Sequence, residues 1–80
     1  MDELLAGKNL ANFVVKHAKK LGLMIIGRST ASVYVRTEEG YRVRISDHRG
    51  KRKQGYESQI CFPGGARPED VVERMRRLAT

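Results

Sequence analysis

Apolar residues near the start of the chain recur at helical spacing. Residues 9–22, NLANFVVKHAKKLG, place an apolar side chain every three or four positions, with lysines between them. This period predicts an amphipathic helix with one buried stripe and one solvated side. Asn9 can cap the start of the helix, and Gly22 suits the left-handed conformation that often follows a helix end. The predicted buried stripe consists of Leu10, Ala11, Val14, Val15, Ala18 and Leu21.

The middle of the chain changes to the alternation that is typical of strands. Residues 23–28, LMIIGR, form an apolar run that is too short for a helix and fits a buried strand. Residues 32–46, SVYVRTEEGYRVRIS, contain two alternating runs on either side of a Glu-Glu-Gly turn, which predicts a hairpin. Residues 57–62, ESQICF, predict a further strand that the following Pro-Gly-Gly sequence ends.

A second amphipathic helix is predicted over residues 67–79, RPEDVVERMRRLA. Pro68 suits the first helical position, where its missing N–H costs nothing. Acidic residues at the start and arginines at the end both complement the helix dipole. The predicted buried stripe consists of Val71, Val72, Met75 and Leu78.

Together these elements predict one small basic α+β domain over residues 1–80. A chain of this length makes a single domain with a modest core. We expect a helix, a three- to four-stranded antiparallel sheet and a helix, with both helices on one face of the sheet. Alternation assigns the hairpin side chains to two faces. The core face holds Val33, Val35, Val43 and Ile45, together with Tyr41, and the opposite face, which we expect to be uncovered, holds Tyr34, Arg36, Arg42 and Arg44.

The positive charge of the chain makes the uncovered face a candidate binding surface. The net charge is +7 and the pI is about 10.1, which favours polyanionic partners or an acidic protein surface. Residues 42–53, RVRISDHRGKRK, hold six basic residues and only Asp47 as an acid. Such a cluster can follow a phosphate backbone, DNA or RNA, while an aromatic side chain stacks on a base. The alternative is a solvated face whose charges deter edge pairing. The predicted nucleic-acid-binding residues are Tyr34, Arg36, Arg42, Arg44, Arg49, Lys51, Arg52 and Lys53.

His48 is the candidate catalytic group. In an extended chain, the adjacent Asp47 and His48 point to opposite faces and cannot form the orienting pair of a catalytic triad. His48 could act as a lone general base beside Arg44, Arg49 and Lys51 in a ribonuclease-like reaction. The alternative is that this segment ends the strand, with Asp47 in an Asx-type turn. We expect the second role, with no catalytic residue and no enzyme activity.

No cofactor or metal site is expected. His17, His48 and Cys61 lie far apart in the sequence, without the paired spacing of a zinc site. Residues 63–68, PGGARP, precede a helix, so their amides could hold an anion. They lack the Lys-Ser/Thr ending of a P-loop, which argues against nucleotide hydrolysis.

The location is expected to be cytoplasmic. A single cysteine allows no intramolecular disulfide, and a reducing compartment is the simplest setting. The acidic start, MDELLAGK, lacks the apolar core of a signal peptide. No apolar run approaches the length of a membrane span, so no membrane partner is expected.

The segment GLMIIGRSTASVYVRTEEGYRVRISDH resembles the HicA family of small mRNA-interferase toxins. That resemblance implies a helix, three strands and a helix in a double-stranded-RNA-binding-like fold. In the family, the catalytic histidine follows a Gly-Ser pair in the first hairpin strand. Here that region reads STASVYV and holds no histidine. The stretch YVRTEEGYRVRISDH is also similar to short accessory proteins of phages and mobile elements. Some of those proteins bind nucleic acid. Others, anti-CRISPR proteins among them, bind host defence complexes.

Three functions are therefore weighed. The first is a non-enzymatic nucleic-acid-binding domain that uses the basic face and loop. The second is a phage-encoded, anti-CRISPR type inhibitor whose basic face docks on an acidic protein surface. The third is a HicA-like ribonuclease toxin that uses His48. A homodimer stays open, because a core with so few aromatic residues would gain from one.

Overall fold

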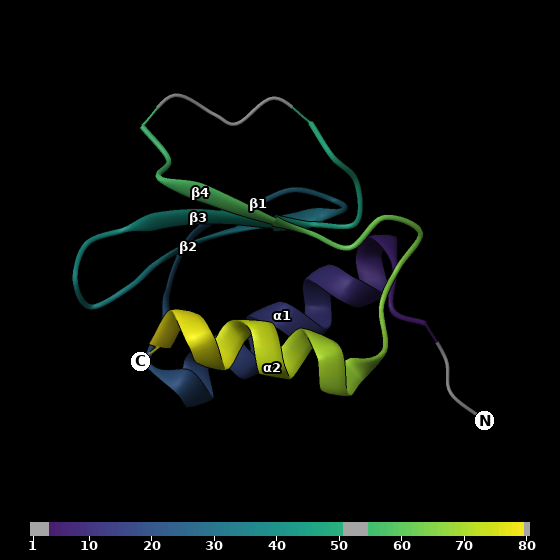
Figure 1. Ribbon diagram of the computed structural model, residues 1–80, viewed down its shortest axis with the longest axis horizontal. Coiled ribbons are helices and arrows are strands. Elements are labelled where there is room, and N and C mark those ends of the chain that lie inside the picture. The colour runs from purple at the N-terminus through teal and green to yellow at the C-terminus, as the bar shows by residue number, and fades with distance from the viewer. Residues whose placement is uncertain (1–3, 51–54, 80) are drawn as a thin grey trace.

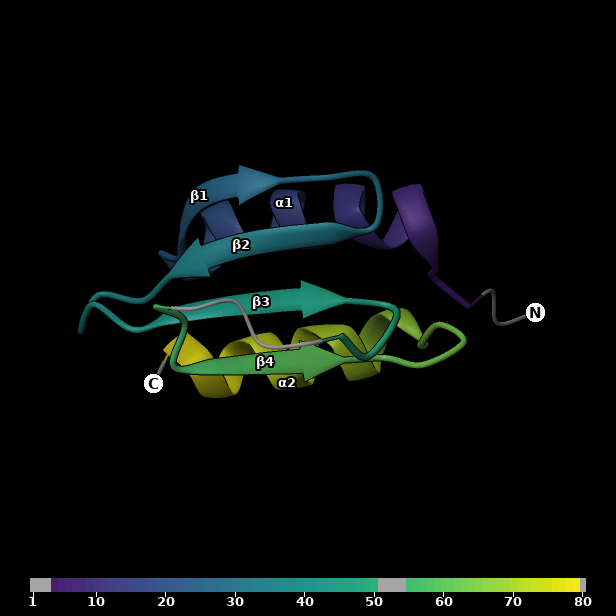
Figure 2. The same cartoon turned by 90° about the horizontal axis from the view of Figure 1, so that it is seen from above.

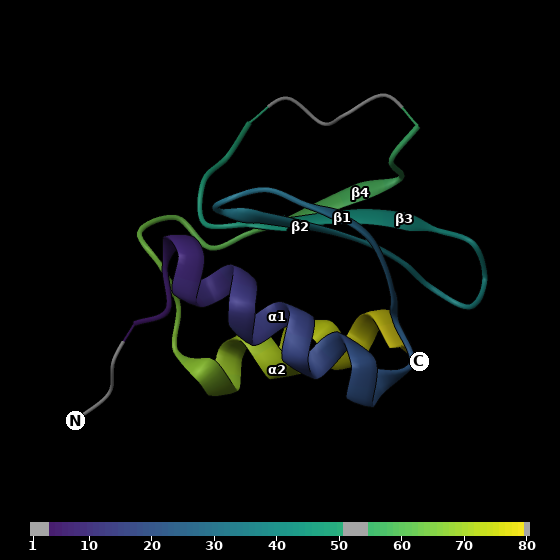
Figure 3. The same cartoon turned by 180° about the vertical axis from the view of Figure 1, so that it is seen from behind.

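Two helices lie beneath a four-stranded sheet in the computed structural model, which describes residues 4–50 and 55–79 (Figure 1). Views from the front and from behind both place the two helices on the same side of the sheet (Figures 1 and 3). The α+β class and the order of elements agree with the sequence prediction. The elements are α1 (Gly7–Leu21), β1 (Met24–Arg28), β2 (Ser32–Arg36), β3 (Arg42–Ser46), β4 (Ser58–Cys61) and α2 (Pro68–Ala79).

The prediction of an entirely antiparallel sheet is wrong. Strands β1, β2 and β3 pair antiparallel in sequence order, but β4 pairs parallel to β3 at the edge of the sheet. Figure 2 shows the arrows of β3 and β4 pointing the same way. A parallel neighbour needs a connection long enough to return to the other end of the sheet, and residues 47–57 supply it. This connection leaves β3 and enters β4 on the side away from the helices (Figure 1).

Strand β1 is an edge strand rather than the buried strand that its apolar sequence predicts. Only one of its faces packs against the core, and its register with β2 shifts between Ile25 and Gly27. Met24 and Ile26 therefore remain 53% and 40% exposed on the outer side. An apolar run identifies a strand but not whether both of its faces are covered.

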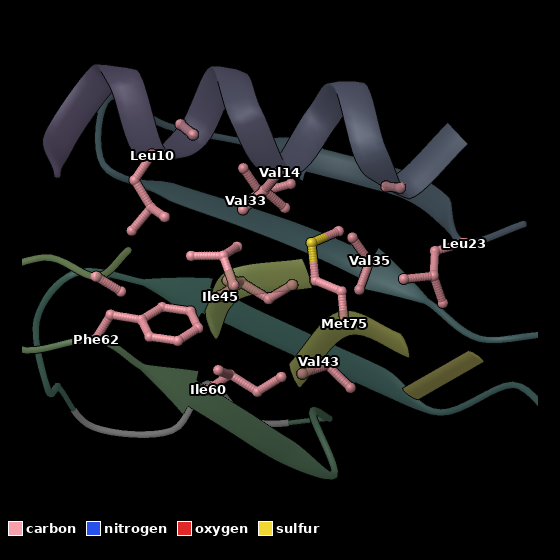
Figure 4. Close-up of a cluster of buried hydrophobic side chains, with 14 residues drawn as sticks. Leu10, Val14, Leu23, Val33, Val35, Val43, Ile45, Ile60, Phe62 and Met75 are labelled. Atoms are coloured by element: carbon pink, nitrogen blue, oxygen red, sulfur yellow. The ribbon is translucent and has the colours of Figure 1, made fainter. Parts of the chain in front are cut away.

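The core fills the space between the sheet and the two helices. Alternation in the hairpin is confirmed for Val33, Val35, Val43 and Ile45, which are all buried. It is wrong for Tyr41, which is 52% exposed, because Tyr41 lies before β3 begins at Arg42. Val33 from β2, Ile45 from β3 and Met75 from α2 lie in one cluster (Figure 4). Leu10 and Val14 complete this cluster from α1. Within the described part of the chain, neither helix is long and apolar enough to cross a membrane.

Helix α1 begins earlier than predicted and without a side-chain cap of its own. Its N-cap residue is Ala6, so Asn9 lies inside the first turn and does not cap the helix. The backbone N–H of Gly7 instead donates to the Asp47 carboxylate, 40 residues away in sequence. At the other end, Gly22 adopts a φ of 77°, which confirms the predicted left-handed end.

Candidate nucleic-acid interface

The outer face of the sheet, on the side away from the helices, carries the polar positions of the hairpin. Register across β2 and β3 places Ser32 opposite Ser46, Tyr34 opposite Arg44, and Arg36 opposite Arg42. These three pairs form one row, because alternate residues of a strand share a face. The row brings together the four residues that alternation assigns to this face.

The middle of this face is covered, contrary to the expectation of an open surface. Gly50 in the β3–β4 connection lies over the Arg44 side chain, where an added β-carbon would come within 3.4 Å of Nη1. Gln59 from β4 donates to the Gly50 carbonyl oxygen at 3.0 Å, which ties the connection to the sheet. Arg44 is consequently only 8% exposed. Its guanidinium is an internal group rather than part of the exposed surface.

Three hydrogen bonds hold the Arg44 guanidinium under the connection. Nη1 donates to Gln59 Oε1 at 3.1 Å. Nη2 donates to Ser32 Oγ at 3.4 Å and to His48 Nε2 at 2.8 Å. A buried cation needs such partners, because an uncompensated one would be costly to bury. Arg44 thus joins β2, β4 and the connection.

Asp47 and His48 do form a pair, and the expectation that they could not is wrong. His48 Nδ1 lies 3.0 Å from Asp47 Oδ1. The expectation assumed extended backbone, but β3 ends at Ser46 and the two residues occupy a bend. In that bend, the Ser46 hydroxyl donates to the His48 carbonyl oxygen at 2.7 Å. Adjacent side chains can then turn toward one another.

The partners of His48 define which of its nitrogens carries a proton. A guanidinium only donates, so Nε2 accepts from Arg44. An ionised carboxylate only accepts, so Nδ1 donates to Asp47. In the tautomer that suits both partners, Nδ1 carries the ring proton and the Nε2 lone pair already has a donor. A general base needs that lone pair free for a substrate proton, so this arrangement makes His48 a structural link.

The Asp47 carboxylate is engaged at both oxygens. Oδ1 accepts from His48, and Oδ2 accepts from the Gly7 backbone N–H at 2.6 Å. The hydrogen bond from His48, followed by that from Gly7, holds the pKa of Asp47 below its ordinary value. Its position at the start of α1 also suits a negative charge, because the helix dipole is positive there. Asp47, the only acid among residues 42–53, therefore uses both carboxylate oxygens in hydrogen bonds within the protein.

Replacing Asp47 by Asn is expected to destabilise the fold in a pH-dependent way. The pKa of Asp47 is lower in the folded than in the unfolded chain, so its ionised form favours folding. That contribution is fully present above the ordinary value of 3.8 and is lost as pH falls through the lower folded value. Urea unfolding at about pH 6 should show a loss of about 0.3–1 kcal/mol, the range for a negative charge at a helix N-terminus. The gap between wild type and Asp47→Asn should narrow as the pH falls below 3.8; a gap that stays constant with pH would contradict the role of the charge.

The exposed cations of the outer face lie around the covered centre. Arg36 and Arg42 are exposed at the hairpin end of the sheet, and Arg49 is exposed on the connection. Tyr34 is half-buried and meets Tyr56 edge-on, with ring centroids 5.4 Å apart. Three predicted site residues lie outside the described residues: Lys51, Arg52 and Lys53.

The side chains considered for a metal are dispersed. His17 stacks on Phe13, and its Nδ1 lies 3.1 Å from the Phe13 carbonyl oxygen. Cys61 is a half-buried thiol paired in register with Ser46. Among the described residues, no three His, Cys, Asp or Glu side chains gather where they could hold a metal ion.

Sequence reasoning missed the polar partners that organise this face. Gln59 touches both Arg44 and Gly50, yet its role depends on the parallel pairing of β3 with β4. Alternation along β4 could have placed it outward, on the face opposite Ile60. No local signal connects Gly7 with Asp47.

Comparisons of the chain with protein-family models, with curated proteins and with solved structures give no match.

Proposed function

We propose that this protein binds nucleic acid through the outer face of its sheet and does not cleave it. Arg36, Arg42 and Arg49 would contact phosphates, because exposed guanidinium groups suit phosphate oxygens. The basic run 51–53 follows Arg49 in the sequence and adds charge to the same connection. Phosphate contacts fix position without reading bases, so little sequence preference is expected.

The observation that carries this proposal is the Arg36–Arg42 pair. The two arginines are direct cross-strand partners on the outer face, and both are exposed. Like charges directly opposite each other on a sheet destabilise it. Among the described residues, neither guanidinium makes an ion pair that would offset this cost. A phosphate bound between them would offset it.

Both oxygens of the Asp47 carboxylate already accept hydrogen bonds, which favours a positive potential on the connection. A free carboxylate beside Arg49 would neutralise part of its charge and repel phosphate. Here its two oxygens face the helix start and the imidazole instead. The fold therefore keeps this acid occupied while Arg49 stays exposed. At the other end of β3, Glu57 Oε1 accepts from the Arg42 backbone N–H at 2.8 Å.

The ribonuclease alternative is less well supported, because the lone pair of His48 is occupied by Arg44. We expect purified protein to leave labelled duplex and single-stranded RNA intact between about pH 6 and pH 8, the range where an imidazole base works. His48→Ala should not alter RNA integrity either. Gel analysis of the RNA after binding provides the measurement. Cleavage by wild type that disappears in His48→Ala would establish the alternative instead.

A protein partner is the second candidate, favoured by the apolar border of the same face. Arg36 Nη2 lies 3.3 Å from Met24 Sδ, and Met24 and Ile26 are exposed on edge strand β1. A charge beside exposed apolar side chains suits an acidic protein surface. This candidate predicts no binding to free nucleic acid at low salt. Binding to an acidic protein would then be lost on charge reversal at Arg36 and Arg42.

A further inference from the structure

We propose that helix α1 presents a second phosphate-binding surface, so that one molecule holds two nucleic-acid segments and bridges them. This inference rests on the proposed function, because it assumes that the outer face of the sheet binds the first segment. The surface, called the lysine face below, consists of Lys8, Lys16, Lys19 and Lys20, with Arg28 beside them.

The lysine face carries no acidic residue from α1. Helix α1 contains four lysines and no Asp or Glu, and all four lysines are exposed. Lys8, Lys16 and Lys20 fall at multiples of four residues, so they follow one side of the helix. At 1.5 Å per residue this row is about 18 Å long. Among the described residues, no ion pair neutralises any of them.

A cation from the sheet is fixed beside this row. Arg28 at the end of β1 reaches α1, where its Nη2 donates to Asn12 Oδ1 at 2.8 Å. Asn12 occupies the position between Lys8 and Lys16 at the same spacing of four residues. The bond therefore places a guanidinium at the gap in the lysine row. An extended row of cations is what a phosphate backbone requires.

The second helix shows that this charge is not a general property of the helical layer. Exposed α2 residues combine three acids with three arginines, so the helix has no net charge. Arg77 also pairs with Glu73, with Nε and Oε1 3.4 Å apart. Positive charge on the helical side of the molecule is thus concentrated on α1. The α2 residues concerned are Glu69, Asp70, Glu73, Arg74, Arg76 and Arg77.

The two basic surfaces face away from each other. Both helices lie on the same side of the sheet (Figures 1 and 3). The buried stripe of α1 packs toward the sheet, so its exposed lysines point away from it, whereas Arg36 and Arg42 belong to the outer row of the sheet. The core lies between the two surfaces (Figure 4). A straight duplex cannot follow both sides of a two-layer domain at once. Occupying both surfaces therefore requires two segments.

A capture assay with two duplexes tests this directly. One duplex is fixed to beads, a second carries a fluorophore, and the protein is added at low salt. Wild type should retain the fluorescent duplex on the beads. Lys16→Glu/Lys20→Glu should reduce capture at least about tenfold, because two phosphate contacts become repulsions. The same variant should still bind a single duplex in anisotropy measurements through the outer face.

Matched variants separate failure of bridging from failure of binding. Arg74→Glu/Arg76→Glu on α2 makes the same change in net charge and should leave capture near the wild-type level. Urea unfolding of each variant verifies that the fold is intact. Capture that survives Lys16→Glu/Lys20→Glu, as a dimer joined through other residues would give, overturns the inference. Wild-type binding without capture also overturns it but leaves the proposed function standing, whereas absence of any binding overturns both.

Discussion

Reversing the charge of Arg36 and Arg42 together is expected to lower affinity for nucleic acid at least about tenfold at about 50 mM salt. Each arginine lost as a phosphate contact also removes about one unit from the slope of log affinity against log salt. The double variant Arg36→Glu/Arg42→Glu should therefore show a slope shallower by about two. Anisotropy titrations of labelled duplexes from about 50 mM to about 200 mM salt give both quantities.

The matched control for this variant is again Arg74→Glu/Arg76→Glu. Its arginines are exposed on α2, away from the outer face, and the change in net charge is identical. If general charge attraction were responsible, both variants would lose affinity equally. We expect the α2 variant to keep most of the wild-type affinity and slope. Equal losses in the two variants would contradict a site at Arg36 and Arg42.

Removing the Arg44 side chain is expected to be among the most destabilising changes to a polar residue in this protein. Arg44→Ala removes the guanidinium that donates to Gln59 Oε1, Ser32 Oγ and His48 Nε2. It also removes the packing of that guanidinium against Gly50 and the aliphatic stem that carries it. Unfilled acceptors and lost packing should together cost about 2–4 kcal/mol in the free energy of unfolding. Urea denaturation measures the loss.

Two further variants show whether the geometry of Arg44 matters. Arg49→Ala removes an exposed arginine from the same region and should change stability by less than about 0.5 kcal/mol. Arg44→Lys keeps the charge but cannot reproduce the planar fork that reaches three acceptors. It should recover only a minor part of the loss. Wild-type stability in Arg44→Ala would contradict its role as the group that joins the connection to the sheet.

Local patterns predicted most of the fold correctly, because the spacing of apolar residues within each segment matches the helix or strand that the segment forms. Alternation sorted the side chains of β2 and β3 but misplaced Tyr41, which lies outside β3. Helical spacing identified most of the buried stripe of each helix, although Val72 is only half-buried. The direction of β4 was wrong because periodicity is the same for a strand that runs either way. What distinguishes the two cases is the end of the sheet at which β4 begins, and no local rule in the sequence encodes that choice.

The candidate site was predicted less completely, for a related reason. Alternation placed Arg44 correctly on the outer face, but its burial depends on the connection above it and on Gln59 beside it. The Asp47–His48 contact depends on a bend that replaces the assumed extended backbone. The link from Asp47 to Gly7 joins residues 40 positions apart. Such long-range contacts follow from the assembled fold and have no counterpart in local periodicity.

A salt titration of wild-type protein tests the central claim most directly. Labelled single-stranded DNA, duplex DNA and duplex RNA are titrated by fluorescence anisotropy from about 50 mM to about 200 mM salt. Binding to at least one polymer is expected, with affinity falling linearly in log salt and with every strand intact after the measurement. No binding to any of the three at about 50 mM salt, where phosphate contacts are strongest, would contradict the claim.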